Sequence, residues 1–150
     1  MLGPMGATRL PAFSPARLVR LRLHRGWSQG RLAVALKVSV NTVGAWERGD
    51  RTPAPPVFLA LAQELKVEPA CLLSVPRGLW TMLELRAASG LYQAAAAEKL
   101  DISATVLRHI ELAYAELPAA HLEEFAAVYQ STPDELVGCW KRTRTQLLQQ

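Results

Sequence analysis

The chain has 150 residues, half of them hydrophobic and a fifth charged, so we expect a globular protein rather than a disordered one. Its apolar runs are too short to cross a bilayer, and residues 1–14 do not resemble a signal peptide, which predicts a cytoplasmic protein without a membrane segment. The two cysteines, Cys71 and Cys139, have the spacing of neither a metal site nor a redox pair.

Charge is unevenly divided along the chain. Up to Arg77 there are eleven Lys and Arg against four Asp and Glu, whereas residues 78–140 carry three basic against nine acidic residues. The last ten residues add three positive charges. A basic first half suits a polyanionic partner and an acidic second half does not, although charges that only keep two surfaces soluble would give the same distribution.

An internal repeat organises the sequence. When the chain is shifted by 64 positions, its first half aligns with its second half without an insertion, and many aligned residues are identical. The identical pairs include Arg22 with Arg86, Gly26 with Gly90, Gln29 with Gln93, Ser39 with Ser103, Glu47 with Glu111 and Pro69 with Pro133. The chain therefore contains two copies of one structural unit.

The first copy begins with two predicted helices. Ser14 is a suitable N-cap and Pro15 suits the first helical position, and Gly26 is placed to end that helix. The second helix begins at Ser28-Gln29 and has apolar residues at the spacing of one helical face.

Three further helices are predicted after a three-residue turn at residues 37–39. Ser39 caps the third helix and Gly49 ends it, a fourth starts near Pro55, and a short fifth follows Pro69. The second copy repeats this order, and no segment shows the two-residue alternation of a strand. We predict an all-α protein of two tandem five-helix domains.

The predicted boundaries divide the chain into four parts. They are a flexible arm at residues 1–13, a first domain at 14–75, a second and divergent domain at 78–140, and a basic tail at 141–150. Within the arm, Arg9 is a candidate for reaching a DNA minor groove.

The segment Trp27-Ser28-Gln29, followed by Val40 to Gly49, resembles the lambda-repressor/Cro-like (XRE) helix-turn-helix family. The resemblance covers residues 15–73 well and residues 79–137 more loosely. It implies a tight two-helix corner that presents the next helix to the major groove of DNA.

The resemblance also implies roles for residues of the first copy. The residues that would face bases are Val40, Asn41, Thr42 and Ala45. Gln29 would contact a phosphate, and Lys37, Arg48 and Arg51 would add contacts to the DNA backbone. Arg22 and Glu47 match a family pair that forms a salt bridge behind the recognition helix, so we expect them to be structural.

The second copy keeps the framework and changes the surface. A possible second DNA site consists of Gln93, which matches Gln29, and of Thr105, Arg108 and His109, which lie in the helix that matches the predicted recognition helix of the first copy. Its acidic flanks disfavour phosphate, and Leu112, Tyr114 and Leu117 form a possible apolar contact surface. We therefore expect the second domain to support association, with a genuine second DNA reader as the rival.

We predict a sequence-specific DNA-binding transcriptional regulator that needs no cofactor, and we expect a homodimer on an inverted or direct repeat of double-stranded DNA. An enzyme is disfavoured because the three histidines are not paired at a metal spacing, and because Cys71 falls in a stretch expected to face the core. A protein-interaction module, like the antitoxins of this family, remains an alternative that would use the acidic second domain.

Overall fold

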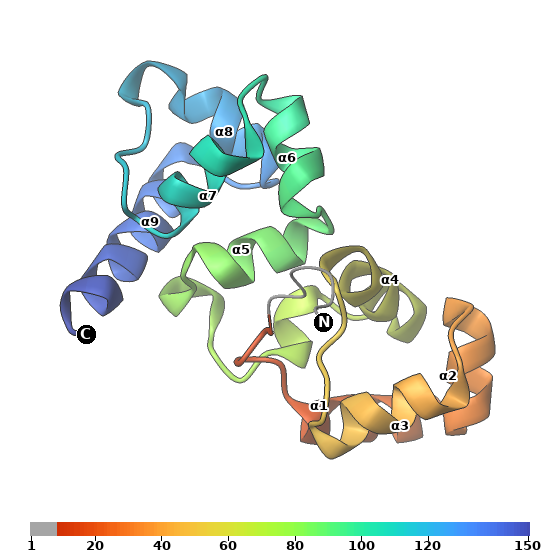
Figure 1. Ribbon diagram of the computed structural model, residues 1–150. Helices are drawn as coiled ribbons and strands as arrows, with labels where there is room; N and C mark the ends of the chain where they lie inside the picture. Colours follow the sequence, from red (N-terminus) through yellow and green to blue (C-terminus); the bar gives the residue numbers. More distant parts are fainter. Residues whose placement is uncertain (1–8) are drawn as a thin grey trace. The chain divides into compact units, whose positions relative to one another are not determined.

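The computed structural model describes residues 9–150, and the chain divides into two compact units that meet between Val75 and Pro76. Every regular element named within those residues is a helix, which confirms the predicted all-α fold. The first unit runs from red to yellow-green in Figure 1 and the second from green to blue. Each is described by itself below.

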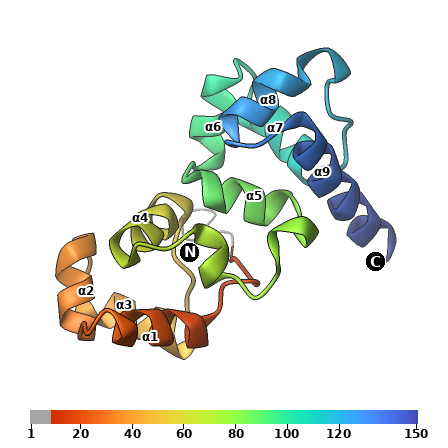
Figure 2. The ribbon, with the colours of Figure 1, turned by 180° about the vertical axis from the view of Figure 1, so that it is seen from behind.

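Unit one contains four α-helices and a closing 3₁₀ turn. In chain order they are α1 (Pro15–His24), α2 (Gln29–Leu36), α3 (Val40–Arg48), α4 (Pro55–Leu65) and η2 (Pro69–Leu72). The fifth predicted helix is therefore a single 3₁₀ turn. Seen from behind, α1 lies alongside α3 (Figure 2), and the two helices are in contact.

Local sequence explains where these helices begin and end. Ser14, Ser28 and Ser39 each precede a helix, and each side chain accepts a hydrogen bond from the backbone amide three residues later at 3.0–3.2 Å. Such a cap contributes about 1 kcal/mol. Gly49 ends α3 in the left-handed conformation, at φ 79°, which a residue without a Cβ adopts at little cost.

The core of unit one fills the space between its helices. The apolar stripes of α1, α2, α3 and α4 supply side chains that are fully or almost fully buried: Leu18, Leu32, Val43, Phe58, Leu61 and Leu65. Because α3 packs against both α1 and α2, only its remaining face is open to solvent. That face carries the residues expected to read bases.

Of the arm predicted at residues 1–13, the structure describes only residues 9–13, and residues 1–8 lie outside the described part of the chain. Leu10 and Phe13 are buried, and Phe13 forms a β-bridge with Leu73. Two apolar side chains close to the start of α1 gain more from burial than from remaining in water, so this segment closes the core of unit one.

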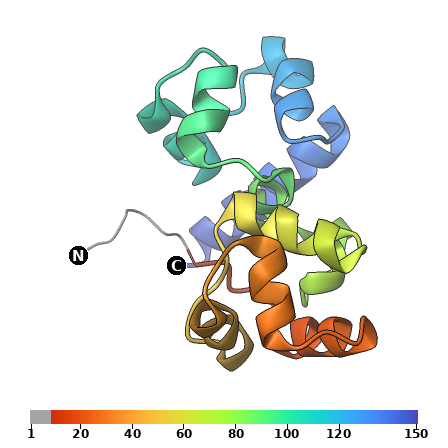
Figure 3. The same ribbon diagram turned by 90° about the vertical axis from the view of Figure 1, so that its right-hand side faces the viewer.

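Unit two repeats the order with longer closing elements. It contains η3 (Arg77–Leu79), α5 (Met82–Ser89), α6 (Gln93–Lys99), α7 (Ala104–Glu111), η4 (Ala119–His121), α8 (Leu122–Val128) and α9 (Pro133–Leu148). Its core side chains include Trp80, Leu85, Leu107, Phe125, Tyr129 and Leu136. Within this unit α9 packs against α5 and α8, and Figure 3 shows it as the dark blue helix that ends at C.

The residues predicted as a basic tail, 141–150, include the last part of α9, which continues to Leu148. Arg142 Nε donates to the Trp80 carbonyl at 2.7 Å, and Thr143 Oγ1 accepts from the Met82 amide at 3.0 Å. These bonds tie α9 to the start of α5, where free backbone groups need partners.

No helix among residues 9–150 is long and apolar enough to span a membrane.

Candidate nucleic-acid interface

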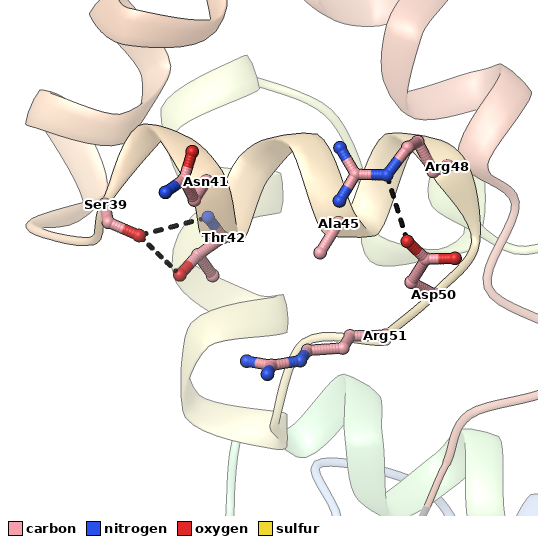
Figure 4. A pocket seen from close by; sticks show the side chains of 7 residues that line it. All are labelled: Ser39, Asn41, Thr42, Ala45, Arg48, Asp50 and Arg51. Carbon is pink, nitrogen blue, oxygen red and sulfur yellow. Dashed lines mark hydrogen bonds and ion pairs between the residues drawn. The ribbon is translucent and has the colours of Figure 1, made fainter.

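The open face of α3 borders a shallow hollow of about 400 Å³. The residues that line it are Ser39, Asn41, Thr42, Ala45, Arg48, Asp50 and Arg51. Figure 4 shows them along one stretch of α3 and the turn that follows it. Five of them are sequence-predicted site residues, so the structure brings most of the predicted set together.

The predicted base readers differ in exposure. Val40 and Asn41 are exposed at the start of α3, Thr42 is half-buried, and Ala45 is buried with its methyl group on the wall of the hollow. The Thr42 hydroxyl lies 2.8 Å from Ser39 Oγ. Asn41, by contrast, makes no side-chain hydrogen bond within residues 9–150, so its amide is available to a ligand.

Three cations surround this face. Lys37, Arg48 and Arg51 are all exposed, and the Arg51 side chain extends beside α3 on the side of Ala45 (Figure 4). Arg48 Nε pairs with Asp50 at 2.9 Å, with both side chains at least 60% exposed. A surface pair of this kind is weak, about 0–1 kcal/mol, so a stronger anion can displace it.

A buried carboxylate holds α3 in place from behind. Arg22 in α1 donates to both oxygens of Glu47, from Nε at 2.6 Å and from Nη2 at 3.0 Å. Gln29 Nε2, at the start of α2, donates to the same carboxylate at 2.8 Å. Arg22 Nη1 also donates to the Trp27 carbonyl at 2.8 Å. The predicted salt bridge therefore joins the first three helices and the turn between the first two.

The surroundings of Glu47 set its protonation. Burial would raise the pKa of this carboxyl, but the hydrogen bonds from Arg22 and Gln29 and the Arg22 charge outweigh burial and hold the pKa below its ordinary value of 4.5. The same bond raises the pKa of Arg22. The pair is thus ionised at neutral pH, and both partners are about nine-tenths buried.

Gln29, which we expected to contact a phosphate, belongs to this buried network. One N–H of its amide is engaged with Glu47, which leaves a single N–H for a phosphate. Arg9 also departs from its expectation. Its Nη2 donates to the Gly49 carbonyl at 3.2 Å, so the side chain lies at the C-terminal end of α3, where backbone carbonyls lack partners within the helix.

Unit two keeps the buried network with one addition. Arg86 and Gln93 donate to Glu111 Oε1 at 2.9 and 2.8 Å, and Tyr129 donates to Oε2 at 2.5 Å. Burial, followed by the charge of Glu111, raises the pKa of Tyr129 far above its usual range. Leu65 occupies the matching position in unit one, where Arg22 donates to both oxygens of Glu47.

The outer face of α7 has a different chemistry from that of α3. Thr105, Arg108 and His109 are exposed, and the His109 ring lies 6.1 Å from that of Tyr114, centroid to centroid. Large apolar side chains are also open to solvent here: Val106 is 48% exposed, Leu112 36% and Tyr114 63%. Leu117 is half-buried.

Sequence reasoning missed one cluster in unit one. The guanidinium carbons of Arg25 and Arg31 each lie 4.4 Å from the centroid of the Trp27 ring. The available signal was a tryptophan with an arginine two positions before it and another four positions after it. The expectation for Cys71 was also wrong, because its thiol is exposed rather than core-facing.

No group of His, Cys, Asp and Glu among residues 9–150 is arranged to hold a metal ion.

Comparison with known proteins places both units. The helix-turn-helix family model HTH_3 matches residues 18–70 and again residues 82–136. Comparisons with curated proteins and with solved structures returned no match. The two matched segments are the two copies of the repeat, and together they cover more than half of the chain.

The buried carboxylate predicts an acid-sensitive unit one. Because the folded pKa of Glu47 is lowered, its contribution to stability is present above about pH 4.5 and is lost as the pH falls through the folded pKa. We expect Glu47→Gln to lower the free energy of unfolding at pH 7 by about 3 kcal/mol. The difference between variant and wild type should shrink on acidification. Denaturant titrations at pH 7 and pH 3.5 measure it, and an equal difference at both pH values would contradict the assignment.

Proposed function

Because the chain belongs to the helix-turn-helix family, a family of DNA-binding regulators, we propose that it is a sequence-specific transcriptional regulator whose first unit reads duplex DNA. The second unit supports association. The observation that carries this division of labour is the distribution of positive charge between the two copies.

Unit one has eight cations that unit two lacks at the matching positions. The pairs are Arg17 with Thr81, Arg20 with Glu84, Arg25 with Ser89, Arg31 with Ala95, Lys37 with Asp101, Arg48 with Leu112, Arg51 with Ala115 and Lys66 with Gln130. The Arg22–Arg86 pair is kept, and there the arginine is buried against a carboxylate. Lysine and arginine supply most of the affinity for the phosphate backbone. The cations thus favour unit one as the DNA-binding copy.

The proposed mechanism inserts α3 into the major groove. Asn41 has a free amide that can both donate to and accept from adenine, and Val40 offers methyl groups to thymine. Arg48 and Arg51 border the same hollow, and Lys37 precedes it, so phosphates on either side of the groove meet positive charge. Arg22, Gln29 and Glu47 hold the angle at which α3 meets the groove.

The second unit is proposed to hold two chains together. The α7 face combines Val106, Leu112 and Tyr114, three exposed apolar side chains where unit one has polar or charged residues at the matching positions. Exposed large apolar side chains are typical of an interaction site. A homodimer is the partner we expect, because two copies of unit one would then meet two half-sites. A different protein partner and a second DNA contact through Gln93, Thr105, Arg108 and His109 are the alternatives.

Alanine substitutions at matched positions of the two units test which unit reads DNA. Asn41 and Thr105 are exposed at equivalent positions of α3 and α7. On a duplex selected for high affinity, we expect Asn41→Ala to weaken binding by about 1–3 kcal/mol and to spare random-sequence DNA. Thr105→Ala should change neither affinity. Fluorescence anisotropy measures both, and equal losses from the two variants would show that both units read DNA.

The role of Lys37 can be separated from stability. Lys37 ends α2 in the left-handed region at φ 59°, which glycine adopts without strain. Lys37→Gly should therefore leave the melting temperature unchanged or raised, while the slope of log affinity against log salt falls by about 1. Lys66→Gly is the matched control, since Lys66 ends α4 at φ 58° and carries the same charge. A similar loss of salt dependence in both variants would mean that only net charge matters.

Association is tested with a pair of exposed tyrosines. Tyr114 and Tyr92 are 63% and 54% exposed, and only Tyr114 lies by the apolar face of α7. Sedimentation velocity should show a dimer that Tyr114→Ser weakens and Tyr92→Ser leaves intact. A chain that sediments as a monomer at all concentrations, or a dimer that both variants leave unchanged, would rule out this surface as the dimer contact.

A further inference from the structure

We propose that Arg25, Trp27 and Arg31 form a phosphate clamp, in which one indole ring holds two guanidiniums ready for a phosphodiester of the DNA backbone. The inference rests on the proposed function, because it names a further binding element of the same DNA-reading unit. Trp27 is the positioning residue and the two arginines are the groups that contact the ligand.

Both guanidiniums are already held in place by the Trp27 ring before a ligand binds. Each guanidinium carbon lies 4.4 Å from the Trp27 ring centroid, within the range of a cation–π contact. A guanidinium that stacks through its flat face keeps its N–H edges free, and these match the oxygens of a phosphate. Stacking also restricts two long side chains before a ligand arrives, which lowers the entropy lost on binding.

The two charges lack counter-ions. Among the described residues no carboxylate lies within ion-pair distance of Arg25 or Arg31, whereas Arg22 nearby is paired with Glu47. Arg25 Nε is buried without a hydrogen-bond partner, so the stack shields the inner edge of this guanidinium. Two positive charges held against one ring repel each other, and an anion between or beside them relieves that repulsion.

The position of the cluster suits a backbone contact. Trp27 directly precedes the N-cap of α2, and Arg31 lies in the first turn of that helix. In helix-turn-helix proteins the helix before the recognition helix crosses the DNA backbone. At this end of α2, one N–H of Gln29 is already given to Glu47. The two arginines therefore supply the strongest donors available to a phosphate there.

The second copy provides an internal comparison. Ser89, Leu91 and Ala95 occupy the positions of Arg25, Trp27 and Arg31 in unit two, and the same corner between two helices forms around them. The clamp is thus not required for the fold of the repeat. It also means that the second copy supplies replacement residues that this fold already accommodates.

The test uses those replacements in the whole chain, with binding to a selected duplex measured at several salt concentrations. Trp27→Leu removes no charge, yet we expect it to weaken binding about two- to fivefold. The double variant Arg25→Ser with Arg31→Ala should lower the slope of log affinity against log salt by about 1 to 2. Adding Trp27→Leu to that double variant should then have no further effect. Arg31→Lys, which keeps the charge without a flat stacking face, should lose part of the affinity.

The controls separate the clamp from other causes. Arg144→Ala removes a charge from a similar stack on Trp140 in unit two and should leave DNA binding unchanged. Melting temperatures show whether each variant is folded, and Arg31→Lys tests the clamp with Trp27 in place. The clamp would be overturned, with the proposed function intact, if Trp27→Leu bound DNA with wild-type affinity. It would also be overturned if Trp27→Leu weakened the double arginine variant as much as it weakens the wild type. A wild-type chain that binds no duplex would instead overturn the proposed function itself.

Discussion

The structure depends on a carboxylate buried behind α3 in unit one and behind α7 in unit two. Glu47 accepts from Arg22 and Gln29, and these three residues come from α3, α1 and α2, so one ionised group joins three helices at its site. Removing one partner of such a pair leaves a buried charge without compensation, which explains why the arrangement occurs in both copies. The second copy uses Arg86, Gln93 and Glu111 in the same way and adds the Tyr129 hydroxyl.

A shared framework leaves each outer surface free to differ. Because the core and the buried network hold the helices, residues on the open face can be exchanged without loss of the fold. Unit one uses this freedom for cations around the hollow beside α3. Unit two has Leu112 and Tyr114 where unit one has Arg48 and Asp50, and both are exposed. One repeat thus supports a surface suited to phosphate and another suited to an apolar contact.

Much of the fold was predictable because its signals are local. Serine caps precede α1, α2, α3 and α7, proline opens α1, α4 and α9, and Gly49 follows α3; each of these signals acts within a few residues. Contacts between segments that are distant in the sequence have no such local signal. Phe13, before α1, forms a β-bridge with Leu73, and Arg142 in α9 donates to the Trp80 carbonyl. Neither partner is near in the sequence.

The sequence by itself determined the repeat, from identical residues at a constant offset, and the all-helical class, from helical spacing and caps. The family resemblance implied the Arg22–Glu47 pair. Tertiary structure decided which donors are still free. It engages one N–H of Gln29 with Glu47, leaves the Asn41 amide open and gathers two arginines on Trp27. Hydrogen bonds and ring contacts depend on side-chain directions in three dimensions, and spacing along the chain does not specify those directions.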